Sequence, residues 1–487
     1  MKYPHEVQNE LLLDLVKKSR KTEYGILHDF DSIRNYADFT QKVPLQTYED
    51  FQPIIERCRR GESNIIWPTP IKLFAKSSGT TNAKSKFIPV SQESLEDCHF
   101  AAGKDMLCMY LNNNPEASLF TGKSLRLGGS KEIYKNNGTS FGDLSALIID
   151  NMPFWADYSS TPSAEVSLMS NWETKLDAIA KETIEEDVTS LAGVPSWMMV
   201  LLQRVLEITE KKDLKEVWPS LEVYFHGGVS FEPYKHQYNK IIEDPAFKYY
   251  QIYNASEGFF ASQDRNGSDD MLLLLDYGIF YEFIPMNTYA SSAEKVISLD
   301  QVEVGKNYAM VITTNGGLWR YKIGDTVKFT SINPYRIRVS GRTKHHINAF
   351  GEELIIENAE QALKKVCKEH QVEILDYTAA PIFMEGKDKG AHEWMIEFKE
   401  NPRKPENFAR DLDLEIQNIN SDYEAKRRNN MTLNQLKLNL AQRDLFYKWL
   451  KINDKLGGQH KVPRLSNSRK LLEELLLLNK KKPKSEN

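Results

Sequence analysis

Cysteine is scarce in this chain. Only four occur among 487 residues (Cys58, Cys98, Cys108 and Cys367), with no CxxC pair and no neighbouring histidine at zinc-ligand spacing. This scarcity argues against a disulfide-built scaffold and against a structural zinc site. We therefore expect reduced thiols and a cytoplasmic location.

Long apolar runs are absent as well. No stretch reaches the roughly 18 apolar residues that a membrane-spanning helix needs. The N-terminal segment MKYPHEVQNELLLDLVKKSRK carries acidic residues and only a short leucine run, which is unlike a secretory signal. We expect no association with a membrane.

An excess of either charge is also missing. The chain has 63 Lys and Arg against 68 Asp and Glu, a formal net charge of −5. This near balance gives no general attraction for nucleic acid or anionic lipid, so any site for a polyanion must be local. The 41% of hydrophobic residues suffices for a substantial core, and the length predicts two or three domains of about 100–200 residues each.

Helical periodicity dominates the start of the chain, where Val7, Leu11, Leu12, Leu15 and Val16 share one helix face. Short β-branched or aromatic runs bounded by polar turns predict buried strands further along. The other expected elements are helices at 91–111, 171–185 and 195–211 and strands at 145–149, 221–225 and 248–253. Helices and strands thus alternate as in an α/β protein with a mixed sheet.

The pattern changes at residue 271. Residues 271–330 contain closely spaced apolar segments joined by glycine-containing turns, with no room for helices between them, which predicts an antiparallel, β-barrel-like unit. Strand-like and helical pieces alternate again after residue 341. We expect a large N-terminal domain, residues 1–340, with β-sheets flanked by helices, and a smaller C-terminal α/β domain, residues 341–487.

A hydroxyl- and glycine-rich stretch, KSSGTTNAKSKFIPV, occupies residues 76–90. Small residues let backbone amides approach phosphate oxygens, hydroxyls donate hydrogen bonds, and a lysine adds positive charge. The candidate phosphate-binding residues are Ser77, Ser78, Gly79, Thr80, Thr81 and Lys86. The spacing differs from a Walker P-loop, and an ordinary polar surface loop has a similar composition.

Two later motifs place a carboxylate at the end of a strand. In YNASEGFFA, Glu257 follows Tyr253 and is positioned to hold Mg²⁺ against phosphate oxygens, with helix capping as the alternative. In GLWRYKIGDTVKF, a turn at Gly324 presents Asp325, whose carboxylate can accept both ribose hydroxyls. A plain Gly–Asp hairpin turn is the alternative there.

Six motifs follow one another along the chain: SSGTTNAKSK, FHGG, YNASEG, GLWRYKIGD, GRTKHHINAFGEEL and GGQHKVPR. In this order they resemble the adenylate-forming superfamily of acyl-CoA synthetases, luciferases and peptide-synthetase adenylation domains. Within that superfamily, the chain looks like the acyl acid amido synthetases, the auxin-conjugating enzymes of plants and their bacterial relatives. The likeness covers about residues 70 to 465.

The resemblance implies a role for each matched residue. The phosphate loop is residues 77–81 with Lys86, and the Mg²⁺ ligand is Glu257. The segment along adenine is Gly227 and Gly228, the ring that stacks on adenine is Tyr253, and the carboxylate that binds the ribose is Asp325. The interdomain arginine is Arg342, and the lysine that meets the α-phosphate and the acyl oxygen is Lys461. Glu257 and Lys461 are the implied catalytic residues, and the C-terminal domain is mobile. By analogy the acyl group sits near residues 124–129 and 195–205, although core packing explains both stretches equally well.

The resemblance also implies ATP and Mg²⁺ as cofactors. A carboxylic acid is activated as an acyl adenylate with release of pyrophosphate, and an amine, expected to be an amino acid, then displaces AMP. Transfer to a thiol such as coenzyme A is an alternative, because GRTKHHINAFGEEL is closer to the general superfamily hinge. A non-catalytic nucleotide-binding protein of the same fold is a second alternative. A monomer is expected, because a swinging domain needs free space.

The chain departs from the family pattern at four positions. Ala83 replaces a glycine, Asn254 and Ala255 replace more typical residues, and Lys322 replaces an arginine. None of these changes removes a charge that adenylation needs.

Overall fold

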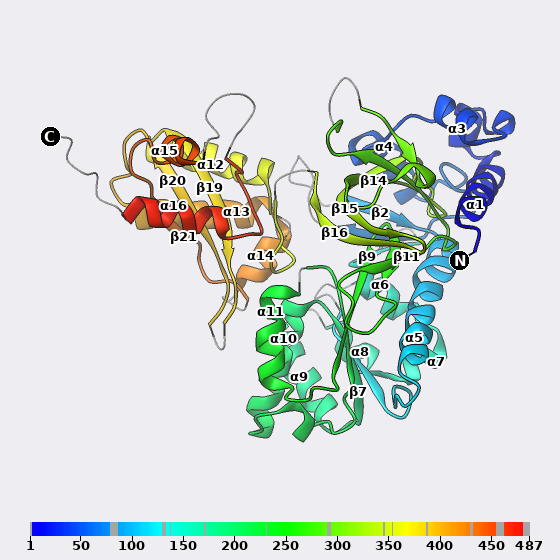
Figure 1. Cartoon of the computed structure of the whole chain (residues 1–487), viewed down its shortest axis with the longest axis horizontal. Helices are drawn as coiled ribbons and strands as arrows, with labels where there is room; N and C mark the ends of the chain where they lie inside the picture. Colours follow the sequence, from blue (N-terminus) through cyan, green and yellow to red (C-terminus); the bar gives the residue numbers. More distant parts are fainter. Residues whose placement is uncertain are drawn as a thin grey trace. The chain divides into compact units, whose positions relative to one another are not determined.

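The computed structural model describes residues 2–77, 86–128, 133–136, 138–169, 172–229, 231–289, 294–343, 346–352, 354–385, 388–428, 432–453 and 462–480. The chain forms two compact units (Figure 1). The first comprises Met1–Ser77, Lys86–Gly228 and Tyr238–Thr343, and the second includes Val229–Gln237 and Lys344–Asn487. All four cysteines are free thiols.

The first unit is built on a twelve-stranded sheet, whose strands lie in the order β13-β12-β14-β15-β16-β11-β10-β9-β8-β7-β3-β6. Their bounds are β3 Lys123–Arg126, β6 Ser160–Thr161, β7 Val188–Gly193, β8 Val223–His226, β9 Lys248–Ala255, β10 Gly258–Ser262, β11 Met271–Leu273, β12 Ile279–Pro285, β13 Ile297–Ser298, β14 Asn307–Thr314, β15 Tyr321–Ile332 and β16 Tyr335–Arg342. Neighbouring strands are parallel from β6 to β9 and antiparallel from β9 to β13. The mixed α/β class expected from the sequence is therefore confirmed, and the antiparallel segment after residue 271 is one end of this sheet.

Helices accompany this sheet in the first part of the chain. They are α1 Pro4–Ser19, α2 Glu23–Leu27, η1 Phe30–Ser32, α3 Tyr36–Lys42, α4 Tyr48–Arg59, the π-helical segment η2 Ser94–Phe100, α5 Ala101–Asn113, α6 Leu144–Asp150, α7 Phe154–Tyr158, α8 Ala164–Ser167, α9 Trp172–Ile184, α10 Pro195–Thr209, η3 Leu214–Glu216, α11 Glu232–Ile241 and η4 Leu299–Gln301. The four predicted helices correspond to α1, η2 with α5, α9 and α10. Helix α10 begins at Pro195, which has no N–H to leave unpaired in a first turn.

The strand predicted at 145–149 is wrong, because these residues lie in helix α6. After Ser145 the run SALII is apolar, and an apolar run of this length does not distinguish a buried strand from a short buried helix. In the structure Ala146 and Leu147 are buried. The strands predicted at 221–225 and 248–253 are confirmed as β8 and β9.

A four-stranded sheet in the order β2-β1-β5-β4 carries the two ends of the predicted phosphate loop. Its strands are β1 Leu73–Ser77, β2 Lys86–Val90, β4 Tyr134–Asn136 and β5 Thr139–Gly142. Strands β1 and β2 are antiparallel, and Ser77 pairs with Lys86. The two ends of the loop are therefore held side by side.

A buried ion pair connects the N-terminal helices to the large sheet. Arg320 Nη2 lies 2.8 Å from Glu282 Oε1, and the two side chains are only 6% and 1% exposed. The same guanidinium donates to the carbonyl oxygen of Val43 at 2.9 Å, and Tyr36 Oη donates to Glu282 at 2.8 Å. Arg320 belongs to the RYKIGD motif, but its partners place it in the core of the unit.

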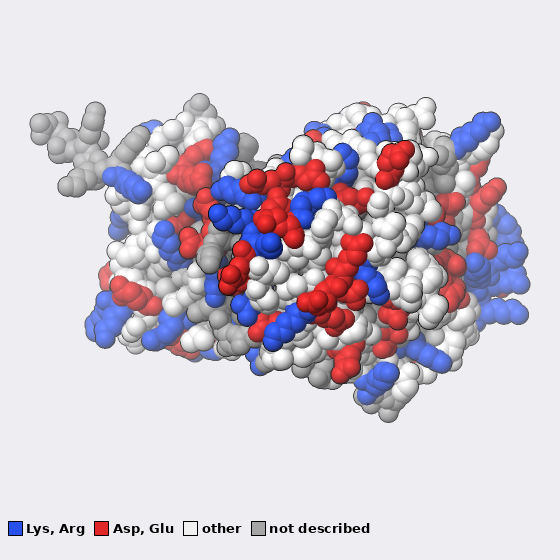
Figure 2. Space-filling view, turned by 90° about the horizontal axis from the view of Figure 1, so that it is seen from below, with Lys and Arg blue, Asp and Glu red and all other residues white. Residues whose placement is uncertain are grey.

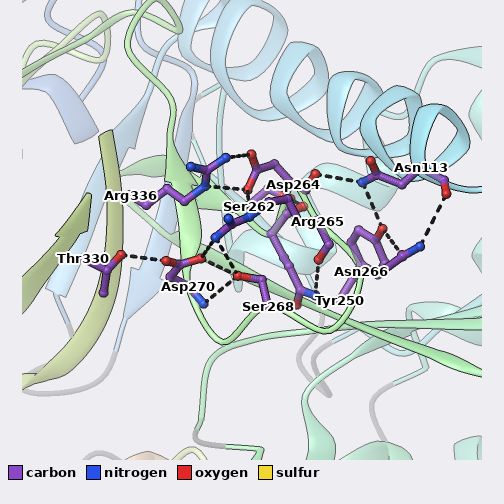
Figure 3. A network of polar contacts seen from close by, with 11 residues as sticks. Asn113, Tyr250, Ser262, Asp264, Arg265, Asn266, Ser268, Asp270, Thr330 and Arg336 are labelled. Atoms are coloured by element: carbon purple, nitrogen blue, oxygen red, sulfur yellow. Dashed lines mark hydrogen bonds and ion pairs between the residues drawn. The ribbon is translucent and has the colours of Figure 1, made fainter. Parts of the chain in front are cut away.

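The loop between β10 and β11 is tied down by a polar network (Figure 3). Arg336 of β16 forms a two-point ion pair with Asp264, with N···O distances of 3.0 and 2.5 Å. Arg265 donates to Asp270 at 2.8 Å, and Thr330 of β15 donates to the other Asp270 oxygen at 2.7 Å. These contacts attach the loop to β15 and β16.

The second unit contains a smaller sheet in the order β19-β20-β21 and a two-stranded sheet of β17 and β18. Its elements are β17 His346–Ile347, β18 Leu354–Ile355, α12 Ile356–His370, β19 Ile374–Ile382, β20 Ala391–Phe398, α13 Pro405–Ile419, α14 Ser421–Arg427, β21 Lys437–Leu440, α15 Leu445–Ile452 and α16 Lys470–Lys480. Glu352 and His392 form a fully buried pair at 2.8 Å. Burial alone would raise the pKa of Glu352, but its hydrogen bond with His392 is among the contacts that lower that pKa below its usual value.

Charged side chains of both signs are interspersed over the face shown in Figure 2, with carboxylates gathered in small groups between lysines and arginines. This distribution agrees with the near-neutral charge balance. Within the described ranges, no helix has both the length and the apolar character that crossing a membrane requires.

Candidate nucleotide-binding site

Asp325 is the centre of a buried polar cluster in the first unit. Tyr253 Oη donates a hydrogen bond to Asp325 Oδ2 at 2.7 Å, and Arg342 Nε lies 2.9 Å from Oδ1. Only 7% of Asp325 is exposed. Three residues singled out in the sequence, from β9, β15 and β16, are thus in direct contact.

A bulge in β15 orients Asp325. Gly324 adopts φ +92°, and the pairing of β14 with β15 shifts register between Ala309 and Val311, opposite this glycine. Glycine adopts such a positive φ without the steric cost that a Cβ brings. The turn predicted at Gly324 is wrong, both as the end of a strand and as a plain hairpin turn, because Asp325 lies inside β15 and pairs with Arg342 across the ladder to β16.

Glu257 lies in the tight turn between β9 and β10, where Ala255 pairs with Gly258. The helix-cap alternative is therefore wrong, since a strand follows. Burial raises the pKa of the Glu257 carboxyl to about 7, while the Lys86 ammonium opposes that rise and the negative charge of Asp325 adds to it. Glu257 nevertheless keeps some exposed surface.

Lys86 begins β2, and its ammonium is near enough to Glu257 to lower the pKa of that carboxyl. Its ammonium lies 5.5 Å from the centre of the Tyr48 ring, and Tyr48 Oη accepts a hydrogen bond from Phe87 N at 2.8 Å. Tyr48 is the first residue of α4. This tyrosine braces the start of β2, and the motifs gave no sign of it because it lies far upstream in the sequence.

Gly227 and Gly228 follow β8 directly. A Cβ on Gly227 would lie 2.6 Å from the carbonyl oxygen of Ile252 in β9, and Gly228 adopts φ +81°. A side chain at either position would push the backbone away from β9 or strain it. The resemblance assigns these glycines to the segment along adenine, and that assignment stays a prediction; Tyr253 follows Ile252 on the same strand.

Tyr321 is a further residue that the motifs did not single out. Its side chain is fully buried, and its hydroxyl has no hydrogen-bond partner within the described part of the chain. Burial and the charge of Glu257 both raise the pKa of Tyr321 well above its ordinary value. A signal was present in RYKIGD, where Tyr321 precedes Asp325 on the same strand.

Several predicted residues lie outside the described ranges. Ser78, Gly79, Thr80 and Thr81 of the phosphate loop and Lys461 are among them, as is Ala83. Ser77 is described as the last residue of β1. Lys322 of β15, which stands where the family pattern has an arginine, forms an ion pair with Glu294 at 2.6 Å.

A cavity of about 450 Å³ lies elsewhere in the first unit. It is lined by α1, η2, α5 and the turn at residues 276–278 before β12, with acidic side chains that include Asp97, Asp105 and Asp276. None of the predicted nucleotide-site residues lines it. Its acidic character is unsuited to the phosphates of a nucleotide.

The cluster offers the groups that a nucleotide requires. A phenol and a carboxylate, Tyr253 and Asp325, are hydrogen-bonded, and Gly227 closely approaches Ile252, the residue before Tyr253. A lysine and a second carboxylate, Lys86 and Glu257, interact through their charges. Oxygen donors on Glu257 suit a hard cation such as Mg²⁺. The described residues contain no cluster of three or more His, Cys, Asp or Glu that could bind a metal by themselves, so a metal here would share its ligands with a phosphate.

Comparison with protein families gives matches along most of the chain. Residues 1–247 match the GH3 family N-terminal domain, residues 272–342 its central domain, and residues 357–470 its C-terminal domain. Among curated proteins, indole-3-acetic acid-amido synthetase GH3.2 of Arabidopsis thaliana is 24% identical over 409 residues, covering 68% of this chain and 72% of that protein. Jasmonoyl-L-amino acid synthetase JAR6 of Nicotiana attenuata is 23% identical, covering 94% and 90%.

Two solved structures share the fold. The AtGH3.15 acyl acid amido synthetase in complex with 2,4-DB superposes with a TM-score of 0.63 at 17% identity, covering 98% of this chain and 94% of that one. A 2-hydroxyisobutyryl-CoA ligase, in complex with 2-HIB-AMP and CoA, gives a TM-score of 0.56 at 12% identity, covering 98% and 92%. With matches to all three of its domains, the chain belongs to the GH3 family.

Proposed function

We propose that this protein is an ATP-dependent acyl acid amido synthetase, which forms an acyl adenylate and passes the acyl group to an amino acid. The observation that carries the proposal is the contact of Tyr253 and Arg342 with Asp325, with Glu257 electrostatically coupled to Lys86 beside it, in a GH3 chain. Curated GH3 relatives named as indole-3-acetic acid and jasmonoyl amino acid synthetases support an amine acceptor.

The first half-reaction joins a carboxylate to ATP. Asp325 accepts the ribose hydroxyls, Tyr253 stacks on adenine, and Gly227 and Gly228 let the backbone lie along the base. Lys86 and the hydroxyl-rich residues before it neutralise the triphosphate, whose charge would otherwise repel the attacking carboxylate. Lys461 meets the α-phosphate and the acyl oxygen as negative charge develops there.

Glu257 fits the role of a Mg²⁺ ligand. Its carboxyl is held partly protonated by burial, and a nearby divalent cation reverses that effect by favouring the ionised form. When bound, Mg²⁺ supplies charge neutralisation to the phosphates.

In the second half-reaction the amine of an amino acid attacks the acyl carbon, and AMP leaves with the bonding electrons of the mixed anhydride. The proton lost by the amine goes to solvent. No protein nucleophile takes part. We further propose that residues 341–487 act as a mobile domain that brings Lys461 into this chemistry, that the protein works as a monomer, and that it acts in the cytoplasm, where its four thiols stay reduced.

The experiment that tests the proposal is ATP–pyrophosphate exchange with a panel of aromatic and aliphatic carboxylic acids. We expect exchange with particular acids only, and its loss in Lys461→Ala and Glu257→Ala. Lys18→Ala is a suitable control, because Lys18 is an exposed residue paired with Asp14 on α1. Nucleotide binding by calorimetry without exchange for any acid would instead favour a non-catalytic protein.

The acceptor is tested separately with the active acids. We expect the amide to form with amino acids and no thioester to form with coenzyme A. Formation of the thioester without the amide would contradict the proposed function and indicate a ligase that acylates thiols.

A further inference from the structure

A short segment, residues 46–48, leads into helix α4 and contacts two of the strands that carry candidate site residues. At one end of the segment, Gln46 forms an isolated bridge with Tyr321, the first residue of β15. The Gln46 N–H donates to the carbonyl oxygen of Arg320 at 3.0 Å, and the Gln46 carbonyl oxygen accepts from Lys322 N at 2.8 Å. The segment is therefore paired with β15 shortly before the bulge in that strand.

At the other end of the segment, Tyr48 holds β2. Its hydroxyl oxygen accepts a hydrogen bond from Phe87 N at 2.8 Å. Among the described strands, β2 is the edge of its sheet and pairs with β1 alone, and an edge N–H that is turned away from the sheet needs a partner from elsewhere in the fold. Tyr48 is only 3% exposed, so little water competes for this bond. The bond fixes the backbone directly after Lys86.

The same tyrosine also contacts the Lys86 side chain. The Lys86 ammonium lies 5.5 Å from the centre of the Tyr48 ring, within the range of a cation–π interaction. At the far end of α4, the Arg59 guanidinium lies 3.6 Å from the centre of the Phe87 ring. Both ends of α4 therefore hold the start of β2.

The start of α4 is itself fixed. The N–H of Thr47 donates to Asp50 Oδ2 at 2.7 Å, as part of a capping box. The Phe51 ring packs edge-on against Tyr321 of β15, with 6.2 Å between the ring centres. These contacts restrict how far residues 46–48 can shift relative to β15.

The groups at the two ends of the segment act on one another electrostatically. The charges of Glu257 and Tyr48 both raise the pKa of Tyr321, and the Lys86 ammonium opposes the rise in the pKa of Glu257. The first turn of α4, the start of β15 and the turn that carries Glu257 therefore lie close together. A displacement of Lys86 would change the charge next to Glu257.

We propose that Tyr48 is a positioning residue, which sets where the Lys86 ammonium stands for the phosphates of ATP. Residues 46–48 form a strut between β15, which carries Asp325, and β2, which begins with Lys86. Tyr48 acts through Lys86 and not on the substrate. This inference rests on the proposed function, because it takes Lys86 as a phosphate-binding residue.

The test is a double-mutant cycle in which ATP affinity is measured by calorimetry. Tyr48→Phe keeps the ring and loses the acceptor for Phe87 N, and we expect it to weaken ATP binding about 2- to 10-fold. Tyr48→Leu also loses the ring, and its loss should be larger, about tenfold or more. In a Lys86→Ala background, either change should alter the affinity by less than about twofold, because its cost is transmitted through the lysine.

Tyr277→Phe is the matched control. It also removes one partly buried hydroxyl, which donates to Asp105 at 2.7 Å, but on the wall of the acidic cavity. Its ATP affinity should stay within about twofold of the wild type. Urea unfolding of each variant shows that it is folded under the conditions of the titration. If Tyr48→Leu fails to fold, the cycle with Tyr48→Phe still decides.

Equal losses of affinity in the wild-type and Lys86→Ala backgrounds would overturn the inference, because they would show that Tyr48 supports the fold without acting through Lys86. An unchanged affinity in Tyr48→Phe and Tyr48→Leu would overturn it as well. If the wild type binds ATP but exchanges pyrophosphate with no acid, the proposed function fails while the cycle still decides the inference. A wild type that does not bind ATP would overturn both.

Discussion

At the scale of single residues, Asp325 organises the candidate site. Its two oxygens accept from Tyr253 and Arg342 at 2.7 and 2.9 Å. A buried carboxylate held by two donors keeps both partners in fixed orientations before a ligand arrives. The sequence named all three residues, because each belongs to a recognisable motif, but their mutual contact depends on strand pairing.

Asp325→Asn should weaken ATP binding strongly. The amide removes the negative charge and turns an N–H₂ group toward Arg342, and disrupting a buried charged pair costs about 2–5 kcal/mol, which corresponds to roughly 30-fold or more in affinity. Calorimetric titration with ATP measures this. Tyr253→Phe is the milder comparison, since it loses one hydrogen bond worth about 0.5–1.5 kcal/mol. Equal affinities for the wild type and Asp325→Asn would remove Asp325 from the site.

The raised pKa of Glu257 predicts that the activity depends on pH. Its carboxyl has a pKa of about 7, raised by burial, so below pH 7 it is mainly protonated and cannot hold a cation. The apparent kcat/KM for ATP should rise about tenfold per pH unit below 7 and level off above it. Exchange rates from pH 5.5 to 9 at saturating acid measure the profile. Glu257→Gln should be nearly inactive, and its residual rate should lack this rise.

At the scale of elements, close backbone approach decides where the chain runs after β8. Gly227 lies against the Ile252 carbonyl, so the chain between β8 and α11 stays beside β9 only without a Cβ. The sequence showed a pair of glycines, and the structure showed which strand they approach.

Gly227→Ala should displace this segment, because the new Cβ would lie 2.6 Å from backbone rather than from a flexible side chain. We expect a loss of about 1–3 kcal/mol in unfolding free energy, as for overpacking, and at least tenfold weaker ATP binding. Urea unfolding and calorimetry measure the two effects. Gly103→Ala in α5 is the control: no atom lies within 4 Å of its Cβ position, and alanine should stabilise the helix by about 0.5–1 kcal/mol. Similar behaviour of both variants would contradict this account.

The Arg320–Glu282 pair should be a stability element. Glu282→Gln leaves the Arg320 guanidinium buried without its counter-charge, and breaking a buried pair costs about 3–5 kcal/mol. Chemical unfolding should show this loss, whereas Glu303→Gln, which removes an exposed pair with Lys306, should change the unfolding free energy by at most about 0.5 kcal/mol. A small effect of Glu282→Gln would mean that water replaces the carboxylate.

At the scale of the whole molecule, the chain divides into two compact units. Glu257 and Asp325 belong to the first unit, whereas Lys461, which we propose for the same reaction, lies outside the described residues. We expect a monomer of 56.2 kDa in solution, because a domain that moves requires free surface. Light scattering after gel filtration measures the mass, and a stable dimer across a tenfold concentration range would contradict the expectation.

The sequence predicted the fold class and the family correctly, because motif order and hydrophobic periodicity are properties of the linear chain. It failed at residues 145–149, where a short apolar run forms α6 rather than a strand. The two local alternatives, a helix cap at Glu257 and a hairpin turn at Asp325, were also excluded only by the structure. The structure of each of these segments depends on which other segment it packs or pairs with, and the local sequence pattern does not encode that partner.

The sequence by itself determined the inventory: the hydroxyl-rich loop, the paired glycines Gly227 and Gly228, the carboxylates Glu257 and Asp325, and the GH3 membership that the order of the motifs indicates. Tertiary structure alone decided how these groups act together. It joined Asp325 to Tyr253 and Arg342, raised the pKa of Glu257 by burial, placed Tyr48 under Lys86, and paired Arg320 with Glu282 and Arg336 with Asp264. The physical reason is that electrostatic energy and desolvation depend on distances in space, which strand pairing and packing set between residues remote in the chain.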